Sequence, residues 1–365
     1  MTKGRAVVAM SGGVDSSVAA ALMVDAGYDV TGIMLKLWRG DEINYSSGCC
    51  NLGAAEDARR VADVLGIPFY VLNFAERFDD TVVKNFRDEY LSGRTPNPCV
   101  SCNQWIKFDA LLDRAKTLGA DILATGHYAR VLERDGAFRL MRGIDAPKDQ
   151  SYVLWMLSRQ QLASCRFPVG EMTKTETRRL AAQLGLRTAR KPDSQEICFV
   201  RDGDFDAYVS EHLGAVAEPG PVLDIAGKVV GEHRGIGRYT IGQRRGVGVS
   251  LGMPVFVTSI DAESNSIVVG SQADLEVAGF VAAGASFTGS APADGAEVFV
   301  QHRAHGEVHE ATVRGCGRGR FEVRYRSPVA AVAPGQSAAL YSGDDPDELL
   351  GGGVIDATVP ARAAV

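Results

Sequence analysis

The sequence of 365 residues lacks the marks of several protein classes. No stretch approaches the roughly 20 apolar residues of a membrane span. The apolar run near the N-terminus ends at Ser11, which is too early for a signal-peptide core, and no cleavage site follows it. Neither sign of charge dominates, because 39 lysines and arginines stand against 45 aspartates and glutamates, so the bulk charge neither indicates nor excludes a nucleic-acid partner. We therefore expect a soluble, cytoplasmic protein without membrane contact.

The cysteine content argues against a disulfide framework. The chain has seven cysteines, an odd number, and no secretory signal. Such a set indicates reduced thiols in an intracellular compartment. The seven are Cys49, Cys50, Cys99, Cys102, Cys165, Cys198 and Cys316.

Strands and helices alternate in the first 200 residues, which favours a parallel, doubly wound α/β sheet with ligands at the carboxyl ends of its strands. Strands are predicted at residues 6–10, 30–35, 69–72 and 122–125. Helices are predicted at residues 16–25, 54–65 and 108–118. Asp135 and Gly136 predict a hairpin within residues 131–140, and the T-x-x-E pattern from Thr173 to Glu176 predicts a capping box that opens a helix.

The composition changes after about residue 200, where glycine, valine and proline become frequent and helical periodicity fades. Short β-rich stretches lie at residues 254–260, 266–269, 297–300 and 321–325. They predict small all-β modules. We expect a nucleotide-binding catalytic domain at residues 1–200, a central β-rich domain at 201–282 and a C-terminal β-barrel domain at 283–365, with a loop at 284–295.

The strongest local signal is the stretch AMSGGVDSS at residues 9–17, between a predicted strand and a predicted helix. Its two glycines permit a tight turn and a close approach to a ligand, and its serines and the amides at the helix start form an anion site. The stretch lacks the lysine of the Walker pattern. An ordinary capped turn is the alternative, but nucleotide sites occur at the end of the first strand of such sheets.

SGGVDSS resembles the PP-loop of the ATP pyrophosphatase superfamily, whose members cleave ATP between the α and β phosphates, usually to adenylate a carbonyl oxygen. The resemblance implies that ATP binds with Leu35 and Gly126 beside the adenosine, and that Mg²⁺ accompanies it near the carboxylate of Asp15. The loop residues implied in ATP binding are Ala9, Met10, Ser11, Gly12, Gly13, Val14, Asp15 and Ser16.

Two cysteine-containing segments distinguish among the members of that superfamily. The segment GRTPNPCVSCN at residues 93–103 has C-x-x-C spacing in a proline-rich loop, and KPDSQEICF spans residues 191–199. Both resemble signatures of the tRNA-specific 2-thiouridylase family (MnmA, TrmU), and further matches extend the resemblance over nearly the whole chain. It implies ATP-dependent 2-thiolation of the wobble uridine of tRNA, through adenylation of the C2 oxygen. The alternative is another PP-loop enzyme that acts on a small-molecule carbonyl.

The resemblance places the sulfur chemistry on two cysteines. Cys198 would carry a persulfide, and Cys102 would either attack the uridine carbon or resolve the persulfide by forming a disulfide with Cys198. Both roles require a thiolate. A sulfur-relay protein or a cysteine desulfurase would supply the sulfur, and we expect a monomer.

Cys99 departs from the family pattern, because many relatives have an acidic residue there that is a candidate general base. Cys99, Cys102 and Cys198 could instead hold a 4Fe–4S cluster with one open position. Cys49 and Cys50 could join a zinc site with Cys99 and Cys102, although we expect ordinary thiols there. Cys165 and Cys316 are expected to pack as small hydrophobic residues.

The resemblance also implies RNA contacts, with the wobble base flipped out of its stack. For His127 a structural hydrogen bond is the alternative, and for Lys148 and Asp149 a solvated turn. The basic cluster Gln243-Arg244-Arg245 is a further candidate for phosphate contact. The residues implied in RNA binding are Asn97, Pro98, Cys99, His127, Lys148, Asp149, Gln150, Arg303, Ala304 and Gln336.

Overall fold

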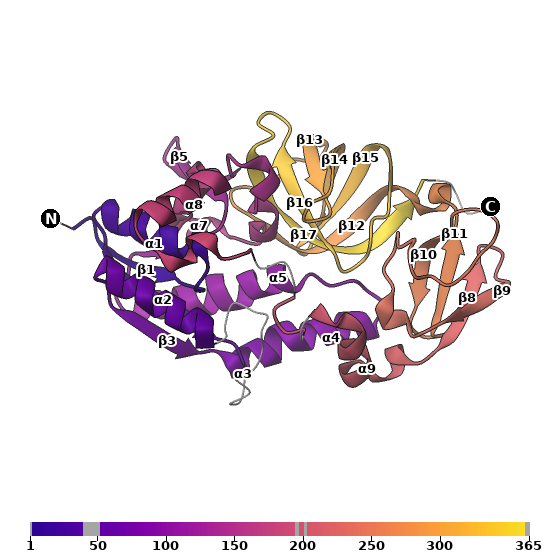
Figure 1. Cartoon of the computed structure of the whole chain (residues 1–365). Helices are drawn as coiled ribbons and strands as arrows, with labels where there is room; N and C mark the ends of the chain where they lie inside the picture. The colour runs from indigo at the N-terminus through magenta and orange to yellow at the C-terminus, as the bar shows by residue number, and fades with distance from the viewer. Residues whose placement is uncertain (1, 39–51, 194–196, 201–202, 362–365) are drawn as a thin grey trace.

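The computed structural model of the chain describes residues 2–38, 52–193, 197–200 and 203–361. Within these residues the strands form a five-stranded, a four-stranded and an eight-stranded sheet. Figure 1 shows the five-stranded sheet with its helices at the N-terminal end, the four-stranded sheet at the opposite end, and the eight-stranded sheet above them. Cys49 and Cys50 lie outside the described residues.

The five-stranded sheet has the order β3-β2-β1-β4-β7, and all of its pairings are parallel. Its strands are β1 (Arg5–Ala9), β2 (Asp29–Lys36), β3 (Phe69–Asn73), β4 (Ile122–Ala124) and β7 (Cys165–Arg166). The first four lie within one or two residues of the predicted strands, which confirms the parallel sheet.

Helices cover both faces of this sheet, because successive residues of a strand point to opposite faces. Val7 and Leu123 pack on one face, beneath α3 (Ala75–Phe78), η1 (Asp79–Val83), α6 (Leu112–Thr117) and α7 (Arg159–Ala163). Ala6 and Val8 pack on the other face, beneath α1 (Val14–Asp25), α2 (Leu52–Leu65) and α8 (Lys174–Gln183). The sheet is therefore doubly wound, as predicted.

The helix predicted at residues 108–118 begins about ten residues earlier. It runs through α5 (Pro98–Ser101), the π-helical stretch η2 (Cys102–Leu111) and α6 without interruption. The side chain of Asn97 caps it by accepting a hydrogen bond from the amide of Val100, and Pro98 occupies the first turn. The expectation of a proline-rich loop around Cys99 and Cys102 was therefore wrong, because proline at the first position of a helix favours a helix start.

Two local predictions are confirmed. Asp135 and Gly136 have φ angles of 52° and 70° and join β5 (Ala129–Arg134) to β6 (Ala137–Arg142) in a hairpin. Thr173 and Glu176 form both hydrogen bonds of the capping box at the start of α8. The hairpin does not join the parallel sheet, because β6 pairs with a strand near the C-terminus, β17 (Glu348–Pro360).

The remaining strands build the two β-rich units. The four-stranded sheet contains β8 (Gly220–Asp224), β9 (Val229–His233), β10 (Phe256–Asp261) and β11 (Ser266–Gly270), and α9 (Phe205–His212) shares its core. The eight-stranded sheet contains β5, β6, β17, β12 (Glu276–Phe287), β13 (Ala296–Gln301), β14 (Val308–Gly317), β15 (Arg320–Ala330) and β16 (Ser337–Ser342). Pairing of β12 with both β15 and β17 closes six of these strands, from β12 to β17, into a barrel, and β6 and β5 extend the sheet beyond β17.

Strand β12 differs from the prediction. Residues 284–287 belong to it, although a loop was predicted at 284–295, and the expected domain boundary between 282 and 283 falls inside it. Pairing of Ser286 with Gly352 and of Phe287 with Gly351 continues the strand beyond a register shift at Gly284. The other short helices among the described residues are α4 (Lys84–Leu91), η3 (Ala146–Lys148), η4 (Ser151–Leu154), η5 (Pro168–Glu171), η6 (Arg187–Arg190), η8 (Gly214–Ala217), η9 (Ile236–Arg238) and η10 (Gln272–Leu275). In the described part of the chain, no helix has the length and apolar character that a membrane span requires.

Candidate active site

The predicted phosphate loop lies where the strand order of the parallel sheet reverses. From β1 the chain proceeds outward through β2 and β3, and it then returns to the other side of β1 to form β4. The loop follows β1, and Thr125, Gly126 and His127 follow β4. Ligands of doubly wound sheets bind in the crevice at such a switch point.

Glycine is required in this loop for steric reasons. Gly12 has a φ of +71°, and a Cβ atom there would lie 2.2 Å from the carbonyl oxygen of Ala54. At Gly126 a Cβ atom would lie 2.6 Å from the amide nitrogen of Ser16, so the chain after β4 lies directly against the start of α1. Gly13 precedes α1 and provides no side-chain cap. The backbone amides of the first turn therefore face the loop as an anion site.

Hydroxyl groups close the loop on itself. The amide of Ser11 donates to Oγ of Ser16 at 3.1 Å, and Oγ of Ser17 donates to the carbonyl of Gly13 at 2.7 Å. Ser11 is exposed, whereas Ser16 and Ser17 are buried. These contacts hold the turn of the loop, in which Ser11 is the exposed serine.

Asp15, in the first turn of α1, is already paired with a cation. Nζ of Lys174 lies 2.8 Å from each carboxylate oxygen, and the hydroxyl of Tyr128 donates to Oδ1 at 2.8 Å. Burial raises the pKa of Tyr128, so its hydroxyl remains a donor. Mg²⁺ uses one or two carboxylates together with substrate phosphates, so Asp15 suits it as one ligand, in exchange for Lys174.

The residues implied beside the adenosine lie on or just after the two strands that flank β1. Leu35 is buried near the end of β2 in the core beneath η2 and α6, and Gly126 follows β4. Leu35 therefore contributes to the hydrophobic core in any case, and its position at the carboxyl end of the sheet is compatible with a purine contact.

Cys102 and Cys198 lie against the same hydrophobic cluster, although they are far apart in the sequence. Cys102 begins η2, and both side chains are half-buried, whereas Cys99 on α5 is exposed. Phe199 fixes the segment of Cys198, since its ring lies 4.9 Å from that of Phe86 and 6.0 Å from that of Phe78. The fold thus brings the two predicted catalytic cysteines to one core.

The structure does not assemble the hypothetical cluster ligands. Among the described residues, no three histidine, cysteine, aspartate or glutamate side chains are arranged to hold a metal ion. Cys99, Cys102 and Cys198 are all described, so they do not form a ligand set in this structure. Cys165 is fully buried, and burial raises its pKa to about 12, so it packs as a neutral thiol, as expected; Cys316 is exposed instead.

The segment before α5 is held by the C-terminal barrel, which the sequence did not predict. The side-chain amide of Gln336 donates to the carbonyls of Thr95 and Pro96 at 2.9 and 3.3 Å, and the amide of Thr95 donates to the carbonyl of Pro334. Arg94 bonds Glu89 at 2.7 Å and Asp356 at 3.3 Å. In the free protein the side-chain amide of Gln336 is therefore hydrogen-bonded to the segment before α5, although the resemblance implied an RNA contact.

The RNA-contact candidates near β4 are engaged within the protein. His127 is buried, and its Nδ1 lies 2.7 Å from Oγ1 of Thr125. Burial, with a smaller effect of Lys107, lowers its pKa, which supports the structural alternative. Asp149 accepts from Arg142, from the amide of Gly143 and from Ser151.

The neighbouring candidates are split between the protein and the solvent. Lys148 pairs with Asp193 at 2.8 Å. Gln150 is exposed, although its Oε1 accepts from the amide of Tyr128. In the barrel, Arg303 is exposed and donates to the carbonyls of Ile241 and Ala331.

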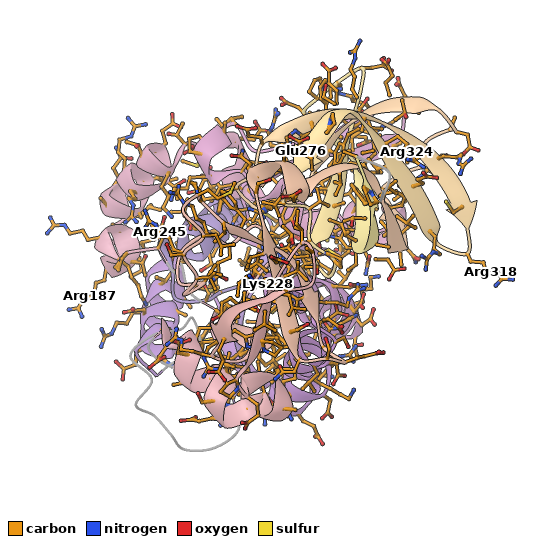
Figure 2. The ribbon with its side chains drawn as sticks, turned by 90° about the vertical axis from the view of Figure 1, so that its right-hand side faces the viewer. Arg187, Lys228, Arg245, Glu276, Arg318 and Arg324 are labelled. Carbon is orange, nitrogen blue, oxygen red and sulfur yellow. The ribbon has the colours of Figure 1, made fainter. Side chains whose placement is uncertain are left out.

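Exposed arginines occur on both β-rich units. Arg244 and Arg245 lie in the segment between β9 and β10, and Arg318 projects from the tip of the hairpin β14–β15 (Figure 2). Several arginines of that hairpin pair with acidic side chains, as Arg326 does with Glu310 and Arg314 with Glu322. The basic groups available to a polyanion are therefore local and scattered, in agreement with the small net charge.

A network of charges links the phosphate loop to the segment before Cys198. Lys191 donates to the carbonyl of Gly12 at 3.0 Å and to Asp57 at 2.9 Å. Asp193 bonds Lys148, Lys174 and Arg178, each at 2.8 Å. Burial opposes ionisation of Asp193, but the hydrogen bonds and charges of Lys148 and Lys174 outweigh it and lower its pKa to about 2. The network joins groups from five segments, and no local pattern reveals it.

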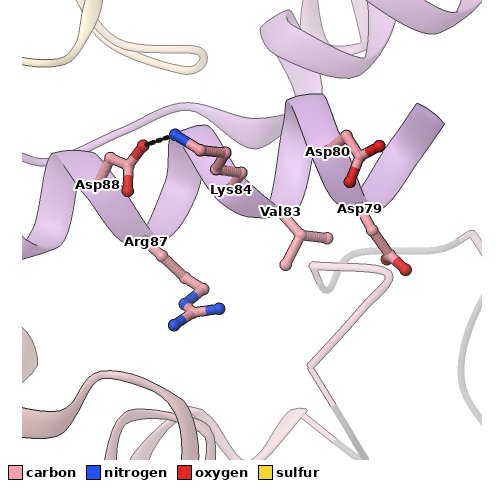
Figure 3. Close-up of a pocket in the computed structure, with 6 residues that line it drawn as sticks. All are labelled: Asp79, Asp80, Val83, Lys84, Arg87 and Asp88. Carbon is pink, nitrogen blue, oxygen red and sulfur yellow. Dashed lines mark hydrogen bonds and ion pairs between the residues drawn. The ribbon is translucent and has the colours of Figure 1, made fainter. Parts of the chain in front are cut away.

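A surface groove of about 530 Å³ lies along η1 and α4, away from the phosphate loop. It is lined by Asp79, Asp80, Val83, Lys84, Arg87 and Asp88. Figure 3 shows Lys84 paired with Asp88 and Arg87 directed to the other side of the helix. Since none of the predicted site residues lines this groove, it is not part of the candidate active site.

Comparison with known proteins covers nearly the whole chain. Residues 4–202 match the family described as tRNA methyl transferase HUP domain. Residues 206–271 match the tRNA methyl transferase PRC-barrel domain, and residues 277–355 match the aminomethyltransferase beta-barrel domain. The tRNA-specific 2-thiouridylase MnmA of Geobacter metallireducens is 47% identical over 97% of both chains. The chain belongs to the MnmA family.

Other MnmA relatives match to the same extent. The protein of Carboxydothermus hydrogenoformans is 46% identical over 96% of this chain and 97% of its own length, and that of Clostridium perfringens is 45% identical over 98% and 99%. Membership in the MnmA family confirms the resemblance inferred from the phosphate loop and the cysteine segments. Membership also accounts for the order of the domains along the chain, a parallel sheet followed by two β-rich units.

Proposed function

We propose that the protein is an ATP-dependent tRNA sulfurtransferase, which replaces the C2 oxygen of the wobble uridine by sulfur. The observation that carries this proposal is the presence, in one domain, of a phosphate loop at the switch point and of Cys102 and Cys198 on one core cluster. The name of the full-length relatives, tRNA-specific 2-thiouridylase, supports it. A PP-loop enzyme for a small-molecule carbonyl would leave Cys198 without a role.

The first half-reaction uses the phosphate loop. The C2 oxygen of uridine attacks the α-phosphorus of ATP, the bond to the bridging oxygen breaks, and pyrophosphate leaves. The amides at the start of α1 would hold phosphate oxygens, since a helix N-terminus favours anions. Asp15 is the residue that would hold Mg²⁺, which when bound neutralises phosphate charge. The product oxygen is then part of AMP, a good leaving group.

The second half-reaction uses the cysteines. The terminal sulfur of a persulfide on Cys198 attacks C2, and AMP leaves with the original oxygen. The thiolate of Cys102 then attacks Sγ of Cys198, so the electron pair of the sulfur–sulfur bond remains on the new 2-thiouridine and a Cys102–Cys198 disulfide forms. A dithiol reductant restores both thiols. In the alternative, Cys102 first attacks C2 and displaces AMP, and the terminal sulfur of the Cys198 persulfide then displaces the Cys102 thiolate from C2. The released Cys102 thiolate attacks Sγ of Cys198, which frees the 2-thiouridine and leaves the same Cys102–Cys198 disulfide.

The partners follow from this chemistry. Each turnover consumes one sulfur atom, so a persulfide-bearing relay protein or a cysteine desulfurase must reload Cys198. Cys102 begins η2, close to Asn97 and Pro98 at the start of α5, so the flipped uridine would contact that helix start. We propose that the enzyme acts on tRNA as a monomer.

Mass spectrometry of tRNA tests the function directly. Cells that lack this protein should lose 2-thiouridine at the wobble position, and the purified protein with ATP, persulfide donor and unmodified tRNA should restore it. Asp15→Asn should abolish tRNA-dependent AMP release, because it removes the carboxylate proposed for Mg²⁺. Unchanged 2-thiouridine in the deletion strain would refute the proposal.

A further inference from the structure

The phosphate loop has no cation of its own. Residues 9–17 contain Asp15 but neither lysine nor arginine. The triphosphate of ATP is a polyanion, and protein phosphate sites commonly add Lys or Arg to backbone amides. Any side-chain cation for the β and γ phosphates must therefore come from elsewhere in the fold.

The ammonium groups of two lysines contact this loop at two points. Nζ of Lys191 lies 3.0 Å from the carbonyl oxygen of Gly12, in the turn after β1. Nζ of Lys174 lies 2.8 Å from both carboxylate oxygens of Asp15, in the first turn of α1. We call Lys174 and Lys191 the lysine pair.

The surrounding structure fixes the lysine pair in place. Lys174 is the first residue of α8, directly after the capping box, and its side chain is only 12% exposed. Arg178 on the same helix donates to the carbonyl of Lys191 at 2.9 Å, which fixes the backbone of the second lysine. Both ammonium groups are thus positioned before a nucleotide arrives.

We infer that the lysine pair binds the pyrophosphate portion of ATP, Lys191 from the side of Gly12 and Lys174 from the side of Asp15. The inference rests on the proposed ATP-dependent function and extends it to residues outside the phosphate loop. The ligand class is a nucleoside triphosphate or free pyrophosphate, and not a nucleoside monophosphate.

The two lysines reach the phosphates differently. An ammonium group has three donors, and the contacts of Lys191 with Gly12 and Asp57 use two of them, so its third can donate to a phosphate oxygen. The ammonium of Lys174 is bonded by both oxygens of Asp15 and by Asp193. Lys174 therefore exchanges Asp15 for phosphate, which leaves the carboxylate of Asp15 to the magnesium ion.

The same positions suit the reaction. When the α–β bond breaks, negative charge grows on the departing pyrophosphate, and ammonium groups fixed beside it stabilise that charge. The lysine pair should therefore affect both ATP affinity and the rate of AMP formation. It should have little effect on AMP, which lacks the β and γ phosphates.

Nucleotide binding to the full chain tests the inference. Lys191→Met and Lys174→Met should each weaken ATP binding at least tenfold, measured by titration calorimetry, and should leave AMP affinity within about twofold of wild type. Pyrophosphate should compete with ATP on the wild type at concentrations that fail on the variants. Lys191→Arg should restore most of the ATP affinity, since it keeps the charge.

Lys228→Met is the matched control. Lys228 is exposed at the turn between β8 and β9, on the four-stranded sheet (Figure 2), and its loss should change neither affinity. Because Lys174 balances Asp15 and Asp193, its variant is also checked by thermal unfolding, and retained AMP binding shows that the site is folded.

The outcomes separate the inference from the proposed function. Equal losses of ATP and AMP affinity, or no loss of either, would overturn the role of the lysine pair. Wild-type protein that binds neither nucleotide and forms no 2-thiouridine would overturn the proposed function itself.

Discussion

The phosphate loop and the cysteine-bearing helix serve one reaction, but the fold positions them in opposite ways. The loop is shaped by its own residues, through contacts such as Ser11 to Ser16 and Ser17 to Gly13. The helix start at Asn97 is preceded by a segment that Gln336 holds across 241 positions of sequence and Arg94 ties to Asp356 across 262. The phosphate loop is therefore held within the catalytic domain, whereas the helix start depends on the barrel.

Because of this difference, we expect the two half-reactions to respond to substitutions in different parts of the molecule. A change in the barrel should disturb the placement of Cys102 while the phosphate loop retains its shape. A change in the phosphate loop should weaken ATP binding while the cysteines stay in place. Each of the following variants is expected to separate the two halves, in order of decreasing effect.

Cys198→Ala should remove thiolation completely. Without this thiol no persulfide can form, whereas the phosphate loop and tRNA contacts are untouched, so ATP and tRNA binding should stay within about twofold of wild type. Mass spectrometry of the tRNA product measures the loss. Cys316→Ala, at an exposed position of β14, is the control and should thiolate normally. Thiolation retained by the Cys198 variant would assign the sulfur to another residue.

Gly12→Ala should weaken ATP binding and leave the placement of the cysteines unchanged. Its Cβ would lie 2.2 Å from the carbonyl of Ala54, and the left-handed backbone adds about 1–2 kcal/mol of strain, so we expect ATP affinity to fall at least tenfold. Gly27→Ala has the same backbone problem, with a φ of +85°, but nothing within 4 Å of its Cβ. It should therefore unfold at a slightly lower temperature and bind ATP normally. Equal ATP affinities of the two variants would contradict the close contact at Gly12.

Gln336→Glu should disturb the placement of the cysteine-bearing helix and so reduce thiolation. The carboxylate keeps the size of the side chain but cannot donate to Thr95 and Pro96, and a lost hydrogen bond costs about 1 kcal/mol. Thiolation should fall about fivefold or more, with unchanged ATP affinity and a thermal midpoint lower by roughly 2–4 °C. Gln272→Glu, an exposed charge-matched variant, should change none of these.

The same Gln336 variant separates two roles of this residue. A contact with RNA alone would weaken tRNA binding and leave the midpoint of the free protein unchanged. A positioning role lowers the midpoint before any tRNA is added. The hydrogen bonds of the structure predict the second result.

Acid should weaken the barrel before it weakens the charge network. Burial, together with His309 and Arg303, lowers the pKa of His302 to about 4, so the unfolded chain binds a proton there first as the pH falls below about 6.5. Barrel stability should decline from about pH 6.5 to about pH 4, by about 1.4 kcal/mol per pH unit at most. Asp193, with its pKa lowered to about 2, stabilises above about pH 4 and loses this effect only as the pH falls toward 2.

Amide hydrogen exchange at pH 7.0, 5.5 and 4.5 measures both regions at once. Protection in β13–β15 should fall in this range, whereas protection in α8 should persist. His302→Gln should flatten the pH dependence in the barrel, and His305→Gln, at an exposed position, should leave it unchanged. Parallel loss of protection in both regions would show that the two units do not differ in acid stability.

Local chemistry made much of the catalytic domain predictable. Apolar runs ended by glycine marked the strands and helices around β1, and Asp135 with Gly136 marked a hairpin whose positive φ angles favour those residue types. The prediction failed at Pro98, where the C-x-x-C segment was expected to form a loop. The same proline stands at the first turn of a helix that Asn97 caps, so the residues that suggested a loop define a helix start.

Long-range pairing explains the other differences. Gly284 suggested the beginning of a loop, but β12 continues because its neighbour β17 offers Gly351 and Gly352 as partners. The hairpin β5–β6 follows the parallel sheet in sequence, yet it joins the barrel through Leu349 and Leu140. No window of sequence contains both members of these pairs.

The sequence by itself determined the phosphate loop, the identity of the cysteines and the alternation of strands and helices, because glycine conformations, helix caps and apolar periodicity act within a few residues. The tertiary structure alone decided that Cys102 and Cys198 reach one core, that Gln336 grips the segment before α5, and that Lys174 and Lys191 meet at the phosphate loop. These contacts join residues that are distant in the chain. They form only when the hydrophobic cores of the sheet and the barrel bring their surfaces together, since burial of apolar area is not specific to any single pair.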